Sequence, residues 1–144
     1  MPSPTRTGIS HHPSAHARTP SVPALYAAIE GPRILRAAGI DAVRAKSERQ
    51  TARLIALADA RGYAVRAPRD PARRGGTVAF DVPHAYEVAQ SLLTRDIVID
   101  YRPGAGIRVA PHFYTKDEEL TLIVEEIKKI LETKAYETHS AVTA

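Results

Sequence analysis

The sequence contains no cysteine among its 144 residues. Disulfide bonds, thiolate catalysis and metal sites built on cysteine are therefore excluded from this chain. Long apolar runs are also lacking, since none approaches the roughly 20 residues that a membrane-spanning helix needs. The N-terminus does not carry the apolar core of a secretory signal. We therefore expect a cytoplasmic protein without a membrane partner.

Positive charge is in small excess. The chain has 20 lysine and arginine residues against 16 aspartate and glutamate residues, which gives a net charge of +4. The basic residues are spread over several segments, so this charge does not indicate binding to nucleic acid. With 44% hydrophobic and 25% charged residues, the composition is typical of a soluble globular domain.

Residues 1–18 form a distinct segment. Pro, Ser, Thr, His and Arg dominate it without hydrophobic periodicity, which predicts a disordered leader. Its lack of acidic residues weakly resembles an organellar transit peptide. His11, His12 and His16 could suggest a metal clip, but a disordered segment offers no preorganised ligands, so we predict no metal site.

Helical periodicity runs from Val22 to Arg61 and again from Asp117 to Thr133. Pro32 and Gly39 interrupt the first region, and Asp41 is placed to cap a new helix. That helix is expected to turn one set of residues inward: Val43, Ser47, Leu54, Ile55 and Ala58. The second region has a single apolar stripe, formed by Leu120, Ile123, Val124, Ile127, Ile130 and Leu131.

Four shorter segments are expected to be strands. Two of them are Tyr63–Ala67 and Thr77–Val82. The other two, 97–102 and 107–110, flank a Pro-Gly-Ala-Gly turn. Strands grouped between helices predict an α+β fold in which a mostly antiparallel sheet packs against helices.

The remaining segments complete this picture. A helix is expected over His84–Thr94, with three residues facing inward: Val88, Leu92 and Leu93. Residues after Lys134 are expected to form a frayed turn.

In the loop before the second strand, Arg73, Arg74, Gly75 and Gly76 could hold an anion, but we favour a solvated loop. Packing roles are expected for four aromatic residues: His84, Tyr101, His112 and Tyr114.

Arg108 is the most informative single residue. It lies between β-branched residues in the expected strand Ile107-Arg108-Val109-Ala110. A guanidinium in such a position is costly to desolvate unless an anion meets it, and its planar fork binds a carboxylate with two parallel hydrogen bonds. The sequence therefore leaves two interpretations open: a site for a carboxylate ligand, or an edge-strand arginine that is exposed or paired with Asp100.

The stretch DYRPGAGIRVAPHFY, residues 100–114, resembles the C-terminal signature of kynureninase, an enzyme that depends on pyridoxal 5′-phosphate (PLP). Further segments resemble this family in the same order along the chain: Thr19–Tyr26, Arg44–Ser47, Pro68–Gly76 and Leu131–Lys134. Together they cover roughly the last seven-eighths of the chain. The predicted topology agrees with the small domain of fold-type-I PLP enzymes.

This resemblance implies roles for two residues. Arg108 matches the family arginine that binds the α-carboxylate of the substrate. Thr19 matches a segment that approaches the cofactor phosphate or the substrate across the interface of a homodimer. Arg18 stands where the family usually has glycine, and Thr19 could instead cap the following helix.

The resemblance also implies what this chain lacks. The lysine that binds PLP and its acidic partner belong to a large domain upstream, and no lysine here has a similar context. Residues 19–134 would then be the C-terminal domain of a kynureninase, followed by a tail over 135–144. We expect it to be inactive alone, not to hold PLP by itself, and to expose apolar surface near Val22–Ile29.

The activity that the resemblance implies for the complete enzyme is hydrolysis of L-kynurenine to anthranilate and L-alanine. This reaction belongs to tryptophan catabolism and the route to NAD. Two alternatives remain at this point: the small domain of another class V PLP enzyme, such as an aminotransferase or a desulfurase, and a non-enzymatic basic α+β module that binds RNA or protein.

Overall fold

The computed structural model describes residues 22–142, and the side chains of residues 22–139. The chain divides into two compact units that meet between Ala37 and Ala38. Thr19 and the three histidines of the leader lie outside the described residues. Within the described part, no helix is both long enough and apolar enough to cross a membrane.

The first unit consists of α1 (Val22–Ala27) and most of α2 (Glu30–Ala38). Pro32 lies inside the first turn of α2, where it is tolerated because the first backbone N–H groups of a helix have no intrahelical partner. Large apolar side chains of this unit are exposed, namely Val22, Leu25, Tyr26, Ile29 and Ile34. The predicted apolar surface near Val22–Ile29 is therefore confirmed.

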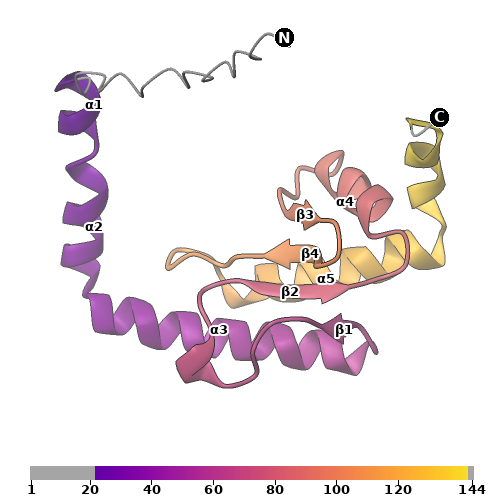
Figure 1. The fold of residues 1–144 in the computed structure, drawn as a ribbon, viewed down its shortest axis with the longest axis horizontal. Coiled ribbons are helices and arrows are strands. Elements are labelled where there is room, and N and C mark those ends of the chain that lie inside the picture. Colours follow the sequence, from indigo (N-terminus) through magenta and orange to yellow (C-terminus); the bar gives the residue numbers. More distant parts are fainter. Residues whose placement is uncertain (1–21, 143–144) are drawn as a thin grey trace, which may run out of the picture. The chain divides into compact units, whose positions relative to one another are not determined.

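The second unit contains a four-stranded sheet (Figure 1). Its strands are β1 (Ala64–Val65), β2 (Val78–Asp81), β3 (Asp100–Arg102) and β4 (Gly106–Val109). They lie in the order β1-β2-β4-β3, and every neighbouring pair is antiparallel. The predicted α+β fold with an antiparallel sheet is confirmed.

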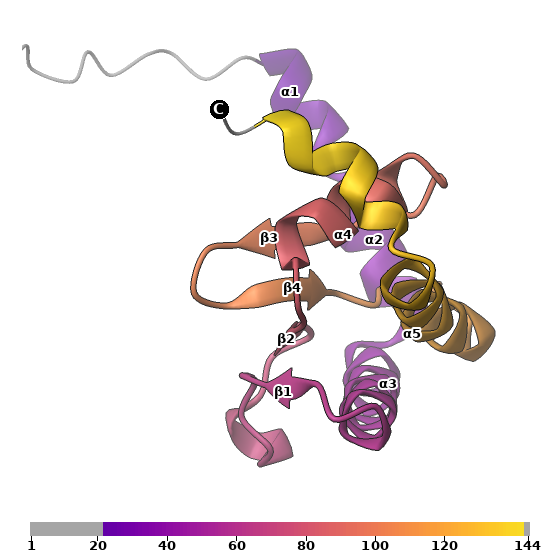
Figure 2. The ribbon, with the colours of Figure 1, turned by 90° about the vertical axis from the view of Figure 1, so that its right-hand side faces the viewer.

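Helices cover one side of this sheet. Helices α3 (Ile40–Ala60) and α5 (Asp117–Glu132) lie side by side there (Figure 2), and α4 (Ala85–Leu93) packs against α5 and the β3–β4 hairpin. Fully buried side chains from the helices and the sheet form one core: Leu54, Phe80, Leu92, Ile107, Leu120, Ile127 and Ile130. The predicted stripe of α5 supplies three of them.

The end of α4 differs from the prediction. The helix closes with two hydrogen bonds, from Ile97 N–H to the Leu92 carbonyl and from Asp96 N–H to the Leu93 carbonyl. Asp96 has φ +59°, so this is a Schellman-type helix end. The predicted inward position of Leu93 is wrong, because its side chain is 53% exposed.

The helix end also shortens the expected strand over 97–102. Residues 97–99 do not pair within the sheet, and β3 begins only at Asp100. Continuing the β3–β4 register would place residues 97, 98 and 99 opposite Pro111, Ala110 and Val109, and Pro111 has no N–H to donate. Val98 is 81% exposed.

The chain after Lys134 is not a frayed turn. It forms a 3₁₀ helix, η2 (Ala135–Val142), that packs on α4 and α5. The ring of Tyr136 stacks on His84 at 4.2 Å between ring centroids. A second 3₁₀ turn, η1 (Pro71–Arg73), lies in the loop between β1 and β2.

Candidate functional site

Strand β4 presents two different faces. Ile107 and Val109 point into the core and are buried. Arg108 lies between them, so it points to the opposite side of the sheet, because successive strand residues alternate. The edge-strand position that the sequence left open as an alternative for Arg108 is wrong: β4 is an internal strand, with β2 on one side and β3 on the other.

The open face of the sheet, as we call the side opposite the helices, carries polar residues. Ala79 of β2 and Asp100 of β3 lie directly opposite Arg108 on its two sides. Other members are Arg66, Asp81 and Arg102. Side chains here are about half exposed or more, apart from Arg108, whose side chain is 27% exposed. The short side chain of Ala79 leaves one flank of the guanidinium uncrowded.

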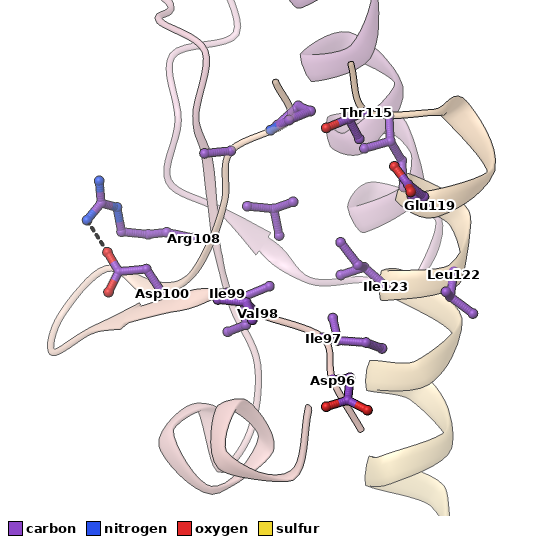
Figure 3. Close-up of a pocket in the computed structure, with 14 residues that line it drawn as sticks. Asp96, Ile97, Val98, Ile99, Asp100, Arg108, Thr115, Glu119, Leu122 and Ile123 are labelled. Carbon is purple, nitrogen blue, oxygen red and sulfur yellow. Dashed lines mark hydrogen bonds and ion pairs between the residues drawn. The ribbon is translucent and has the colours of Figure 1, made fainter. Parts of the chain in front are cut away.

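Arg108 is paired with a carboxylate of its own chain. Its Nη1 lies 2.5 Å from Oδ2 of Asp100, and Figure 3 shows the two side chains pointing toward each other, away from Leu122 and Ile123 of α5. The pair that the sequence allowed as an alternative therefore exists. Within the described part of the chain, Nε and Nη2 of Arg108 have no hydrogen-bond partner. One edge of the guanidinium thus remains able to receive a second anion.

A groove of about 520 Å³ lies beside this pair, between residues 96–100, the end of β4 and the first turns of α5. Its lining is mainly apolar, with Ile97 and Ile99 from the segment before β3 and Ile123 from α5 (Figure 3). Two of its polar side chains have structural partners. Thr115 Oγ1 accepts from His112 N–H at 2.9 Å, and Glu119 Oε2 accepts from Lys116 N–H at 2.8 Å. The groove's other acidic side chains are Asp96 and Asp100.

The segment after β4 is tied to helix α3. Lys46 Nζ donates to the Phe113 carbonyl at 2.7 Å, and Gln50 Nε2 donates to the Thr115 carbonyl at 2.8 Å. Gln50 also donates to Asp117 Oδ1 at 2.9 Å. This hydrogen bond lowers the pKa of Asp117, helped by the nearby charges of Arg49, Arg53 and Lys46 and opposed by burial. These contacts fix the path of the chain that leaves the Arg108 strand.

The loop over residues 73–76 is solvated at Arg73, Gly75 and Gly76, as favoured from sequence, but Arg74 departs from that prediction. Arg74 is only 5% exposed. Its Nε donates to Thr51 Oγ1 at 3.0 Å, and its Nη1 donates to the Pro68 and Arg69 carbonyls at 3.1 and 2.7 Å. Arg74 therefore stabilises the loop from inside, and its donors are directed at protein acceptors rather than at a ligand.

The lysines do not fit a covalent PLP site within the described residues. Lys46 is bound to a backbone carbonyl, while Lys128 and Lys129 pair with Glu132 and Glu126 on α5. Lys116 and Lys134 flank α5 and are exposed. None of them lines the groove beside Arg108. A Schiff base would need a lysine in a cofactor pocket.

The other candidates have packing partners. His112 stacks on Tyr114 at 4.4 Å between centroids, and Tyr101 meets Tyr86 edge to face. In the part of the chain that the structure covers, there is no group of three or more histidine, aspartate or glutamate residues that could hold a metal ion. Thr19 and the leader histidines cannot be placed, and their roles stay predictions.

Four buried polar residues were not expected from the sequence. Gln50, Thr51, Arg74 and Ser91 are each at most 5% exposed. Helical spacing could have identified the first two, because they continue the inward face of α3 between Ser47 and Leu54. The inward face was assigned mainly to apolar residues, with Ser47 as its one polar member, and Gln50 and Thr51 were left out of it.

Comparison with known proteins gives a consistent result. Residues 43–127 match the family model described as "Kynureninase C-terminal domain". The chain is 32% identical over 127 residues to a kynureninase of Geobacillus thermodenitrificans, which covers 85% of this chain and 30% of that protein. It is 34% identical over 112 residues to kynureninases of Burkholderia mallei and Burkholderia pseudomallei, covering 71% of this chain and 27% of each of them. The chain thus spans less than a third of the length of these curated relatives.

Proposed function

Because this chain belongs to the kynureninase C-terminal domain family, we propose that it supplies the substrate-carboxylate site of a kynureninase. In this role Arg108 binds the α-carboxylate of L-kynurenine. The complete enzyme hydrolyses this substrate to anthranilate and L-alanine with the help of PLP. The chain by itself is inactive in this proposal, because the PLP-binding lysine belongs to another domain.

The free edge of Arg108 is the observation that carries this proposal. An internal strand holds the residue, so its backbone position is set by hydrogen bonds to both neighbours. Its guanidinium faces the open side of the sheet with Nε and Nη2 available, as described above. A carboxylate bound there would receive two parallel, charge-assisted hydrogen bonds, which would orient the α-carbon of the substrate.

The other parts of the site come from outside the described residues. We assign the Schiff-base lysine, the acid partner of the cofactor ring and most phosphate contacts to a large domain that corresponds to the remaining length of the relatives. Thr19 is proposed to approach the cofactor phosphate across a homodimer interface. The exposed apolar side chains of α1 and α2 support burial against such partners. A cytoplasmic location also belongs to this proposal.

Binding of RNA finds little support on the open face. Asp81 and Asp100 lie among its arginines and pair with Arg66 and Arg108. These aspartates offset the positive charge of the arginines, and binding to a phosphate backbone depends on such positive charge. The open face also lacks the stacking aromatic residues of RNA-binding sheets.

A chimera tests the proposed role of Arg108. This chain would replace the matching C-terminal part of the Geobacillus thermodenitrificans kynureninase, and anthranilate release from L-kynurenine would be measured. Arg108→Leu should lower kcat/KM about 100-fold, because two charge-assisted hydrogen bonds are lost. Arg66→Leu on the same open face is the matched control and should change kcat/KM less than about threefold. Equal effects of the two substitutions would contradict the proposal.

A further inference from the structure

Asp100 and Arg108 meet because the backbone places them opposite each other. They are register partners in the β3–β4 pair, and both side chains extend on the open face. Directly opposed residues have neighbouring Cβ atoms, so their contact follows from strand pairing. The ion pair is therefore built into the sheet and does not depend on a chance surface rotamer.

The contact engages only one nitrogen of the guanidinium. Oδ2 of Asp100 meets Nη1 of Arg108, and the same oxygen lies 3.9 Å from Nε of Arg102. Since a guanidinium is planar, anchoring Nη1 also fixes the direction of the Nε–Nη2 edge. Asp100 thus holds Arg108 in place without occupying the edge that a carboxylate ligand would use.

Fixing the Arg108 side chain before a ligand binds affects the affinity for that ligand. A free arginine side chain has many rotamers, and a ligand that binds it must restrict them. An arginine that is already fixed in a suitable orientation loses less freedom on binding. Against this gain stands the negative charge of Asp100, which repels a second carboxylate. Asp100 is 57% exposed, so solvent weakens that repulsion.

We propose that Asp100 is a positioning residue: it fixes the guanidinium of Arg108 through Nη1 and leaves the Nε–Nη2 edge to bind the α-carboxylate of the amino-acid substrate. This inference rests on the proposed function. The competing role for Asp100 is a built-in competitor that blocks the ligand site. The two roles differ in sign, because removing a positioning residue weakens binding whereas removing a competitor strengthens it.

The test uses the full 144-residue chain in solution. The ¹⁵N–¹H resonance of Arg108 Nε, assigned by its loss in Arg108→Lys, is followed by NMR during titration with L-kynurenine. Kynuramine, the same molecule without the α-carboxylate, is the control ligand. Asp81→Ala, which removes the other open-face aspartate, is the control variant. Backbone amide spectra show whether each variant is folded.

The expected results separate Asp100 from Asp81. Asp100→Ala should weaken L-kynurenine binding about tenfold and sharpen the Arg108 resonance as the side chain becomes mobile. Asp100→Asn should stay within about twofold of the unmodified chain, because its amide oxygen still accepts from Nη1. Asp81→Ala should change neither readout.

Two other results would count against the inference in different ways. If the unmodified chain responds to L-kynurenine and Asp100→Ala binds it equally well or better, the positioning role of Asp100 is wrong and the carboxylate site stands. If the unmodified chain responds to L-kynurenine no differently from kynuramine, the proposed carboxylate site at Arg108 fails, and the role of Asp100 fails with it.

Discussion

Two arginines of this chain lie in contrasting surroundings. Arg74 is almost fully buried and donates to two backbone carbonyls and a hydroxyl. Arg108 is partly exposed and contacts a single carboxylate through one nitrogen. The more deeply buried arginine is therefore the structural one. In our proposal the ligand site is marked by available hydrogen-bond donors, and burial alone is not a guide to it.

The local backbone explains this contrast. Arg74 lies in an irregular loop, where Pro68 and Arg69 have carbonyls outside the sheet ladder, and its side chain supplies the hydrogen bonds that such carbonyls need. Arg108 lies in a strand whose backbone groups are satisfied by β2 and β3. Its side chain is not needed to complete the fold, so it remains available for binding.

The largest expected difference between Arg74 and Arg108 is in the loss of stability when each guanidinium is removed. Arg74→Met should destabilise the chain by about 3 kcal/mol, because the three hydrogen bonds of this buried guanidinium are lost. Arg108→Met should cost less than about 1 kcal/mol, since its pair with Asp100 is partly exposed to solvent. Urea unfolding measures both values, and Arg73→Met is the exposed control from the same loop. Equal losses for Arg74→Met and Arg108→Met would contradict the division of roles.

Gly106 tests how rigidly the Arg108 strand is held. It has φ +84°, and a Cβ there would lie 2.5 Å from the Phe80 carbonyl oxygen of β2. Gly106→Ala should therefore cost about 2 kcal/mol or more, through both strain and collision. Gly104→Ala is the matched control, with φ +78° and open space around the added Cβ. It should cost only about 1 kcal/mol from strain.

These two glycine variants also bear on the site. Because the collision pushes β4 away from β2, Gly106→Ala should lower L-kynurenine turnover in the chimera more than Gly104→Ala does. Similar unfolding free energies for the two variants would show that the close approach of β2 and β4 does not stabilise the sheet.

The smallest expected effect concerns acid stability. The hydrogen bond from Gln50 lowers the folded-state pKa of Asp117. The ionised carboxylate therefore stabilises the folded state fully at pH values above the unfolded pKa of about 3.9, and this stabilisation is lost as the pH falls through the folded-state pKa. Asp117→Asn should make the unfolding free energy fall less steeply below about pH 4. Gln50→Leu should have the same effect on the slope.

Urea unfolding at several pH values between neutral and acid measures these slopes. The double variant should change the acid slope no more than Asp117→Asn alone, because that substitution already removes the carboxylate whose pKa the Gln50 hydrogen bond lowers. An acid slope that is unchanged in both single variants would show that the Gln50–Asp117 contact does not contribute to stability.

Much of the second unit follows from sequence pattern. Helix α5 begins at Asp117 as predicted and ends at Glu132, one residue before the expected end, and its apolar stripe forms the core. Such a long amphipathic helix has a strong periodic signal. The strand pair around the Pro-Gly-Ala-Gly turn was also predicted, because turn residues and alternation agree there.

The end of α4 could not be predicted in the same way. A Schellman helix end usually carries glycine at the residue with positive φ, and here Asp96 takes that place. Without the glycine signal, the apolar run that follows was assigned wholly to a strand. Residues 97–99, which follow this helix end, do not pair within the sheet.

The candidate site was found only in part from sequence. Arg108 and its alternative partner Asp100 could be named, because a charged residue between β-branched residues is conspicuous. The internal position of β4 and the free edge of the guanidinium depend on strand order, which short segments do not specify. The buried position of Arg74 was missed because a Gly-Gly-containing basic segment is typical of a solvated loop.

The most direct measurement of the central claim is the preference for a carboxylated ligand in the chimera. Affinities of L-kynurenine and kynuramine would be compared in the unmodified protein and in Arg108→Leu. We predict that the unmodified protein prefers L-kynurenine by about 30-fold or more, and that Arg108→Leu abolishes this preference while it leaves kynuramine binding nearly unchanged. A preference of the same size in Arg108→Leu would show that another group binds the carboxylate and would contradict the account.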